Sequence, residues 1–346
     1  MTYTSVVGRA LAGAVIAALA AAACSSAART ETRSTAPPAI PRAPAATDKP
    51  SVASTSSTVA AIGAGLKQRY ETALPEAIQE AAATTAGDRL YVLGGYDIAR
   101  NSSDRAFVFD GTSWHRAPAL PVAVNHPGAA TVGAAVYLAG GFTPGGATNR
   151  AFVLARGATQ WRELAPMHHA RGALALLALG GRLYAIGGRD HSAQLAPTEM
   201  YDPSNGRWSD TVVMPEPRNH LSGYADGGEA CVAGGRTPQS SAAIDCLDVG
   251  NAQWRPRAVL PTATSGAAAA VLAGATIVAG GEPANETRLV PVVQILRDSA
   301  WTTMPMLVPR HGTAFAMFRG RLWMCGGATT PGFHAVPTCI SLGPST

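Results

Sequence analysis

Arginine, asparagine and histidine recur at matching positions of the chain, each a fixed distance before a Gly-Gly pair. Arg171, Arg218 and Arg310 stand sixteen residues before such pairs. In the second, fourth and sixth repeats, the one or two residues that follow this position are also polar: Asn125, His126, Asn219, His220 and His311. A guanidinium offers a planar fork that pairs with a carboxylate or a phosphate. We therefore expect these eight residues to attract an anionic ligand if the fold brings them together.

A structural role for the same arginines is the alternative. Acidic residues in nearby loops could pair with the guanidinium groups inside the fold: Glu76, Asp97, Asp190, Glu216 and Glu282. Buried polar groups are usually paired, so this role is favoured for any single arginine. Both roles stay open for the cluster as a whole.

Motifs of known catalytic chemistry are missing from the sequence. It has no His-Glu-x-x-His, no Gly-rich phosphate loop and no Gly-x-Ser-x-Gly elbow. His168 and His169 are adjacent, and adjacent residues of a strand face opposite sides, so we do not expect them to share one ion. We predict no catalytic residue, no metal site and no cofactor.

Six Gly-Gly pairs set the period of the chain. They stand at 94–95, 140–141, 187–188, 234–235, 280–281 and 326–327, which gives spacings of 46, 47, 47, 46 and 46 residues. An apolar run precedes each pair, and a Trp follows five of them by twenty or twenty-one residues. Short apolar segments separated by Gly, Pro and Asn, without a helical pattern between them, predict about four strands per period. Such a period predicts an all-β, six-bladed β-propeller.

The apolar run, the Gly-Gly pair and the spaced Trp resemble the kelch repeat, over residues 67–342. The matches are fullest at 171–188, continued by Tyr201-Asp202-Pro203 and Trp208, and at 310–327. The resemblance implies that ligands bind at one mouth of the central channel, where the three arginines would reach in. It also implies a binding module for a protein, or for an acidic small molecule or sugar.

Two other functions stay open. An enzyme that interconverts the anomers of sialic acid is also a six-bladed bacterial kelch protein, and Glu80, or Glu216 beside Arg218, could transfer a proton at an acidic sugar. A purely structural or assembly protein of the cell envelope is the second alternative. The copper site of galactose-oxidase relatives is not expected, because disulfides explain the cysteines of the mature chain better.

The two ends of the repeat array predict how the ring closes. After 338–342 only four residues remain, too few for the Trp-bearing outermost strand of the sixth repeat. Residues 68–75 resemble 160–166, with Tyr70 in the place of Trp161. We therefore expect residues 67–74 to complete the last blade, because pairing both ends in one sheet removes an exposed strand edge.

Four cysteines fall within two of the repeats. Cys231 and Cys246 flank the fourth Gly-Gly pair, and Cys325 and Cys339 flank the sixth. A whole repeat separates the two sets and puts them beyond disulfide reach, so we predict the bonds 231–246 and 325–339 between adjacent strands. The two sets are offset by two residues relative to their glycines, so at least one pair could be diagonal rather than directly opposed.

The first 60 residues predict export and a tether. Arg9 precedes an unbroken apolar run, 10–23, which is too short to span a bilayer and is typical of a signal peptide over residues 1–23. The run ends at Cys24 in a box that resembles that of bacterial lipoproteins, which predicts lipidation of Cys24 and attachment to the outer side of the cell membrane. Release as a soluble secreted protein is the alternative. Residues 24–60, rich in Ser, Ala and Pro, predict a disordered tether, and residues 61–346 the propeller.

The charge of the chain excludes one class of partner. The sequence has 27 Lys and Arg against 22 Asp and Glu, of which residues 1–60 contain five cations and two anions, so residues 61–346 carry 22 minus 20, or +2. A near-neutral body lacks the basic stripe of a nucleic-acid-binding protein. We expect no nucleic-acid partner, membrane contact only through a lipid anchor, and a monomer.

Overall fold

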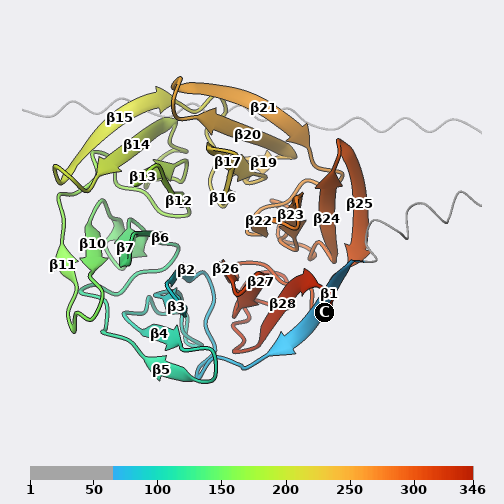
Figure 1. Cartoon of the computed structure of the whole chain (residues 1–346), viewed down its shortest axis with the longest axis horizontal. Helices are drawn as coiled ribbons and strands as arrows, with labels where there is room; N and C mark the ends of the chain where they lie inside the picture. Colours follow the sequence, from blue (N-terminus) through green and yellow to red (C-terminus); the bar gives the residue numbers. More distant parts are fainter. Residues whose placement is uncertain (1–64, 346) are drawn as a thin grey trace, which may run out of the picture. The chain divides into compact units, whose positions relative to one another are not determined.

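Six four-stranded antiparallel sheets surround a central channel in the computed structural model, which describes residues 65–345 (Figure 1). Each sheet is one blade of a propeller, and its four strands are arranged in order from the channel to the outer edge. The predicted all-β, six-bladed β-propeller is confirmed. Residues 65–345 contain no helix that could cross a membrane. The predicted signal peptide, Cys24 and the tether lie outside the described residues.

The first three blades follow one another along the chain. Blade 1 contains β2 (Ala82–Ala86), β3 (Arg89–Leu93), β4 (Ala106–Phe109) and β5 (Trp114–Arg116). Blade 2 contains β6 (Gly128–Val132), β7 (Ala135–Ala139), β10 (Ala151–Leu154) and β11 (Arg162–Glu163). Blade 3 contains β12 (Ala175–Leu179), β13 (Arg182–Ile186), β14 (Pro197–Asp202) and β15 (Arg207–Val213).

The last three blades bring the chain back to its first strand. Blade 4 contains β16 (Ser222–Asp226), β17 (Glu229–Ala233), β20 (Ala243–Asp248) and β21 (Gln253–Val259). Blade 5 contains β22 (Ala268–Leu272), β23 (Ala275–Ala279), β24 (Val292–Arg297) and β25 (Ala300–Pro305). Blade 6 contains β26 (Ala314–Phe318), β27 (Arg321–Cys325), β28 (Cys339–Pro344) and β1 (Leu66–Glu71). Two short hairpins add β8 (Phe142–Thr143) with β9 (Gly146–Ala147), and β18 (Arg236–Thr237) with β19 (Gln239–Ser240).

The hydrophobic core is divided among the blade interfaces. Six apolar clusters are buried, and each one joins side chains of two neighbouring blades. Leu93 of blade 1 and Phe152 of blade 2, for example, lie in the same cluster. Every blade therefore buries apolar surface against both neighbours, which only a closed ring allows.

The Gly-Gly pairs end the second strand of each blade where the next blade comes closest. Gly140 has a φ of 67°, and a Cβ atom there would lie 2.4 Å from the carbonyl oxygen of Arg171 in the next blade. The N–H of Gly141 donates to the same carbonyl at 2.8 Å. A left-handed backbone in such close contact accepts only glycine, and this explains the period seen in the sequence.

The ring closes as the sequence predicts. β1 pairs with β28 in antiparallel register, from Leu66 opposite Pro344 to Glu71 opposite Cys339, so the N-terminal strand is the outermost strand of blade 6 (Figure 1). The strand spans 66–71, so it begins one residue before the expected 67–74 region and ends three residues before its end. The side chain of Gln68 also bonds to blade 5, where it donates to the carbonyl of Pro305 and accepts from the N–H of Leu307, both at 2.8 Å.

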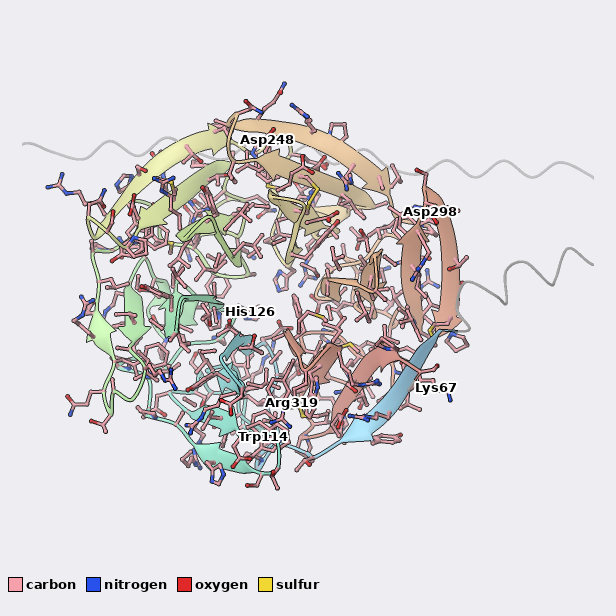
Figure 2. All side chains as sticks on the ribbon, in the orientation of Figure 1. Lys67, Trp114, His126, Asp248, Asp298 and Arg319 are labelled. Atoms are coloured by element: carbon pink, nitrogen blue, oxygen red, sulfur yellow. A yellow bond between two sulfur atoms is a disulfide. The ribbon has the colours of Figure 1, made fainter. Side chains whose placement is uncertain are left out.

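Both predicted disulfides are confirmed. Cys231 and Cys246 join β17 to β20, and Cys325 and Cys339 join β27 to β28 (Figure 2). Both pairs are directly opposed, so the expected diagonal arrangement is wrong. The chain between the two strands is longer in blade 6 (326–338) than in blade 4 (234–242), which restores the register despite the offset in sequence.

The three arginines predicted to reach into the channel mouth lie inside the blades instead. Arg171, Arg218 and Arg310 have no exposed surface. Arg171 donates to the carbonyls of Gly187 and Pro197 at 2.9 Å, and to the carboxylate of Glu199 at 2.8 Å. That part of the anion-binding prediction is therefore wrong.

The other two arginines are also bonded to oxygen atoms of their own blades. Arg218 pairs with Asp245 at 2.9 Å and with Glu216 at 3.0 Å. Arg310 donates to the carbonyls of Gly326 and Thr338 at 2.8 Å. These guanidinium groups satisfy carbonyl and carboxylate oxygens where the strand pairing stops near the Gly-Gly pairs, which is the structural role that was left open.

Removing β1 tests the closure. A variant chain that begins at Pro75 should melt about 10 °C below one that begins at Ala61, because it loses the buried Leu66 and one edge of pairing, together worth several kcal/mol. Thermal unfolding followed by circular dichroism measures the difference. Adding a synthetic peptide of residues 61–74 should restore part of the loss. Equal melting temperatures would contradict closure by β1.

Removing a buried arginine tests its structural role. Arg171→Ala leaves the fully buried Glu199 without its guanidinium partner, so we expect a loss of about 3–5 kcal/mol of unfolding free energy. Arg182→Ala, which breaks a half-exposed pair with Asp202 in the same blade, is the matched control and should cost under about 1 kcal/mol. Denaturant titration measures both variants. Similar losses in the two variants would show that Arg171 does not hold blade 3 together.

Candidate functional site

A closed ring of six backbone hydrogen bonds encircles the channel axis. One residue from the start of each blade donates its N–H to the carbonyl of the corresponding residue in the preceding blade, over 2.7–3.0 Å: Glu80 to Gly312, His126 to Glu80, Ala173 to His126, His220 to Ala173, Gly266 to His220 and Gly312 to Gly266. All six residues have φ between 52° and 64°. This conformation is rare for residues other than glycine, and here the ring of bonds holds it in place.

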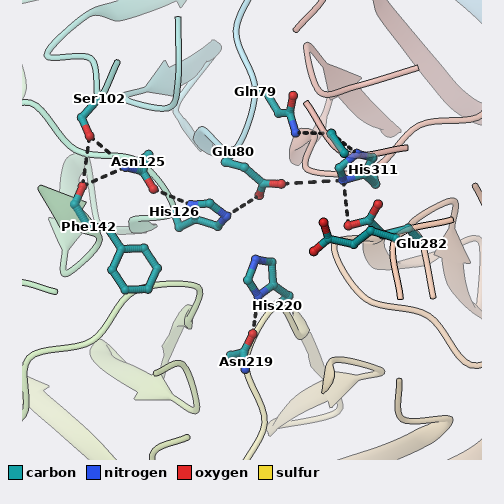
Figure 3. Close-up of polar contacts among 12 residues, drawn as sticks. Gln79, Glu80, Ser102, Asn125, His126, Phe142, Asn219, His220, Glu282 and His311 are labelled. Carbon is teal, nitrogen blue, oxygen red and sulfur yellow. Dashed lines mark hydrogen bonds and ion pairs between the residues drawn. The ribbon is translucent and has the colours of Figure 1, made fainter. Parts of the chain in front are cut away.

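Three of the six ring residues direct functional side chains toward the axis. Glu80, His126 and His220 converge there (Figure 3), and Figure 2 shows His126 beside the channel. His126 Nε2 lies 3.2 Å from Glu80 Oε2, and the ring centroids of His126 and His220 are 4.8 Å apart. The other three positions are Ala173, Gly266 and Gly312, and the Glu80 carboxylate lies where a side chain at Gly312 would be.

The residue before each histidine fixes the orientation of its ring. Asn125 donates its amide N–H groups to Ser102 Oγ and to the carbonyl of Phe142, so its Oδ1 accepts from His126 Nδ1 at 2.6 Å (Figure 3). Asn219 repeats this arrangement, since its amide donates to the carbonyl of Arg236 and its Oδ1 accepts from His220 Nδ1. Both imidazoles therefore carry their proton on Nδ1 and turn the Nε2 lone pair toward the axis.

Burial keeps both histidines neutral. It lowers the pKa of His126 to about 3, and it lowers the pKa of His220 well below its usual value. Burial likewise raises the pKa of Glu80. Each shift follows from the cost of placing a charge away from water.

A second pair of titratable groups lies beside the first. His311 donates from Nε2 to the carbonyl of Gly332 at 2.8 Å, and its Nδ1 lies 3.4 Å from Glu282 and 3.8 Å from Glu80 (Figure 3). Burial raises the pKa of Glu282 to about 7. Its Oε2 has no hydrogen-bond partner among the described residues, while Arg236 is 4.0 Å from the carboxylate and 2.7 Å from Glu286. Glu282 is thus a buried acid beside His311, and one of its oxygens has no hydrogen-bond partner among the described residues.

Aromatic rings form one wall of the mouth. Tyr96 and Phe142 lie 5.7 and 5.6 Å from the His126 ring, and Phe333 lies 6.0 Å from Tyr96. The guanidinium of Arg100 stacks over Phe333 at 5.6 Å. These half-buried rings come from blades 1, 2 and 6, and with the acids they combine apolar and polar surface in the way that binding sites do.

The channel continues from these side chains as a cavity of about 460 Å³ lined by the innermost strand of each blade. Alanine is the commonest residue of the lining, for example Ala129, Ala175 and Ala269, and Thr84 and Thr131 bond to each other there at 3.0 Å. Small side chains on the innermost strands therefore keep the axis open.

Five of the eight predicted site residues do come together around the axis: Asn125, His126, Asn219, His220 and His311. Their role in binding stays a prediction. The arginines of the set are absent from this cluster, because their side chains fold back into the blades.

Several mouth residues were missed or underrated, although the sequence carries a signal for them. Tyr96, Phe142, Arg236 and Glu282 each follow directly after a Gly-Gly pair. Each of these residues bridges to the residue that precedes a ring position, as Phe142 does to Asn125. The position after the glycines is therefore a mouth position in every repeat.

His168 and His169 differ from expectation. They lie in the connection between β11 and β12 rather than in a strand, and both rings approach Asp210, at 3.0 and 3.6 Å. Glu199 is close, but Arg171 and the N–H groups of both histidines use its oxygens. This group therefore has a structural explanation.

Sequence comparisons find similarity to kelch proteins. Residues 170–211, the third repeat, match the family model for the Kelch motif. Beta-scruin of Limulus polyphemus is 34% identical over 100 residues, which cover 29% of this chain and 11% of that protein. Kelch-like protein 33 of Homo sapiens is 40% identical over 57 residues, 16% of this chain and 11% of that protein. The matches thus span only about a tenth of these relatives.

A solved structure extends the likeness to the whole ring. The structure of YjhT matches with a TM-score of 0.68 and 15% sequence identity, and the match covers 79% of this chain and 99% of that chain. This identity supports likeness of fold alone. The glycine-marked repeats, the six blades and these similarities together identify the chain as a kelch-repeat β-propeller.

Proposed function

We propose that this chain is an exported binding module that holds a segment of a partner protein at the channel mouth. Kelch propellers are protein-binding modules in general. The observation that carries the proposal is the convergence of side chains from different blades at one place, namely the half-buried aromatic wall of Tyr96, Phe142 and Phe333.

The disulfides support export. Both bonds are buried between paired strands, and structural disulfides persist in oxidising compartments outside the cytosol. Attachment through a lipid on Cys24 belongs to the same proposal, with secretion of a soluble form as the alternative.

The mouth favours a ligand that donates hydrogen bonds rather than an anion. With the three arginines inside the blades, the acids Glu282 and Glu286 lie 4.0 and 2.7 Å from Arg236. A lysine, an arginine or a hydroxyl group of the ligand would bond to the half-exposed carboxylate of Glu286. An apolar side chain of the same segment would pack on the aromatic wall.

The enzyme alternative loses the acid and arginine that the sequence offered it. Arg218 is buried and bonded to Glu216 and Asp245, so it does not reach the mouth to hold an acidic sugar, where Arg236 is the arginine present. Glu80 remains at the axis as a group that could transfer a proton. The assembly alternative needs no mouth, so the position of the partner separates it from the binding module.

Photo-crosslinking locates the partner. A photoreactive phenylalanine analogue replaces Ile98, which is 75% exposed in the loop after the first Gly-Gly pair, and in a second chain it replaces Val259, which is 70% exposed at the end of outer strand β21. In the cells that produce the protein, we expect a discrete protein adduct from position 98. Phe333→Ala should reduce it roughly tenfold or more, because truncated aromatic anchors weaken binding strongly.

The photoreactive residue at position 259 distinguishes binding at the mouth from the assembly role. An adduct formed equally at 259 and insensitive to Phe333→Ala would support the assembly role and contradict binding at the mouth. No adduct from position 98 would also contradict the proposal.

A further inference from the structure

We propose that Glu80, His126 and His220 bind one divalent transition-metal ion on the channel axis. The inference goes beyond the binding of a partner, because it concerns the side chains of the ring itself and requires no partner. It stands on the geometry of three ligand atoms, on the hydrogen bonds behind them and on the contact between Glu80 and His126.

The three ligand atoms are already close to coordination distances. One atom from each of the three residues lies within 4.8 Å of the other two, and the pair from Glu80 and His126 is 3.2 Å apart. Ligands at 2.0–2.1 Å from a tetrahedral ion are about 3.3 Å from each other. The Glu80–His126 distance already matches this spacing, and the distances to the His220 nitrogen, at most 4.8 Å, must shorten for all three atoms to bind one ion.

The histidines are oriented as metal ligands are. In protein metal sites the second ring nitrogen usually donates to a nearby oxygen, which fixes the tautomer and aims the free nitrogen at the ion. Asn125 and Asn219 provide this oxygen for His126 and His220, and Asn125 is held in turn by Ser102 and Phe142. Two copies of the same Asn-His pair thus present two Nε2 lone pairs to one point.

The contact between Glu80 and His126 requires a positive centre. His126 Nε2 carries no proton in this arrangement, yet it lies 3.2 Å from a carboxylate oxygen. Two acceptor atoms at this distance repel each other unless a cation or a shared proton lies between them. A metal ion satisfies both atoms and His220 together, whereas a proton satisfies only the pair.

The ligand set selects the class of ion. Two imidazoles and one carboxylate suit Zn²⁺, Fe²⁺, Co²⁺ and their first-row neighbours, while Ca²⁺ and Mg²⁺ prefer oxygen ligands throughout. Ala173, Gly266 and Gly312 occupy the other three ring positions. The Glu80 carboxylate lies where a side chain at Gly312 would be, and none of these three residues brings a competing ligand to the axis.

Cobalt and zinc titrations of the purified protein test the site after dialysis against a chelator. We expect one Co²⁺ to bind per chain and to show a visible absorption spectrum typical of a low coordination number. One equivalent of Zn²⁺ should displace the bound Co²⁺. His220→Ala should weaken Zn²⁺ binding at least about 100-fold, since it removes a direct ligand, and Asn219→Ala about 10- to 100-fold, since it removes the support of that ligand.

Two features make the variants interpretable. Ala173 already occupies the equivalent ring position with the same left-handed backbone, φ 56° against 53°, so His220→Ala should fold, and its melting temperature without metal checks this. His191→Ala, an exposed histidine in the loop after the third Gly-Gly pair, is the matched control and should leave affinity unchanged.

Three results would overturn the proposal. The first is wild-type binding no tighter than that of a folded His220→Ala. The second is an equal loss of affinity in His191→Ala. The third is the absence of a Co²⁺ spectrum, which would mean that Glu80 and His126 share a proton only.

Discussion

The ring of six N–H to carbonyl bonds around the axis is the constraint on which the site depends. Each bond joins adjacent blades, and the sixth joins Glu80 to Gly312, so the ring exists only when all six blades are in place. To make these bonds, Glu80, His126, Ala173 and His220 adopt a left-handed backbone that disfavours any residue with a Cβ atom. The strain persists because neighbouring blades fix both ends of each residue. The same conformation turns the side chains inward, so the backbone bonds that hold the blades together also bring Glu80, His126 and His220 face to face.

The fold could be predicted from the sequence because its signals are local and repeated. A glycine pair is needed wherever the next blade touches the second strand, as at Gly140 and Gly141, so the period of the glycines gives the number of blades. The missing outermost strand of the sixth repeat and the resemblance of residues 68–75 to 160–166 gave the closure. The cysteines could be paired because one repeat separates the two sets.

The site could be predicted only in part, because side-chain direction depends on contacts that sequence spacing does not contain. Arg171 and Arg310 stand two residues before the ring positions Ala173 and Gly312, yet their own side chains turn back to carbonyl oxygens of the same blade. Thr264, at the same position of the fifth repeat, bonds to the carbonyl of Gly280 in the same way. In these three blades, the side chain at this position therefore donates a hydrogen bond to the carbonyl of the first glycine of the pair. Glu282 was one of the acids that could have paired with these arginines, but it lies beside His311 with one buried oxygen unpaired.

The pairing of β1 with β28 sets the order in which the molecule can form. β1 is synthesised before every blade and its partner strand after nearly all of them, so the outermost strand of blade 6 must wait for almost the whole chain. Contacts between residues this distant in sequence are slow to form, because the intervening chain must first be ordered. Until β28 is made, β1 has no partner and blade 6 lacks both of its outer strands. A chain that ends before β28 would therefore leave the edge of β27 exposed and β1 unpaired, which would mark it for aggregation or proteolysis.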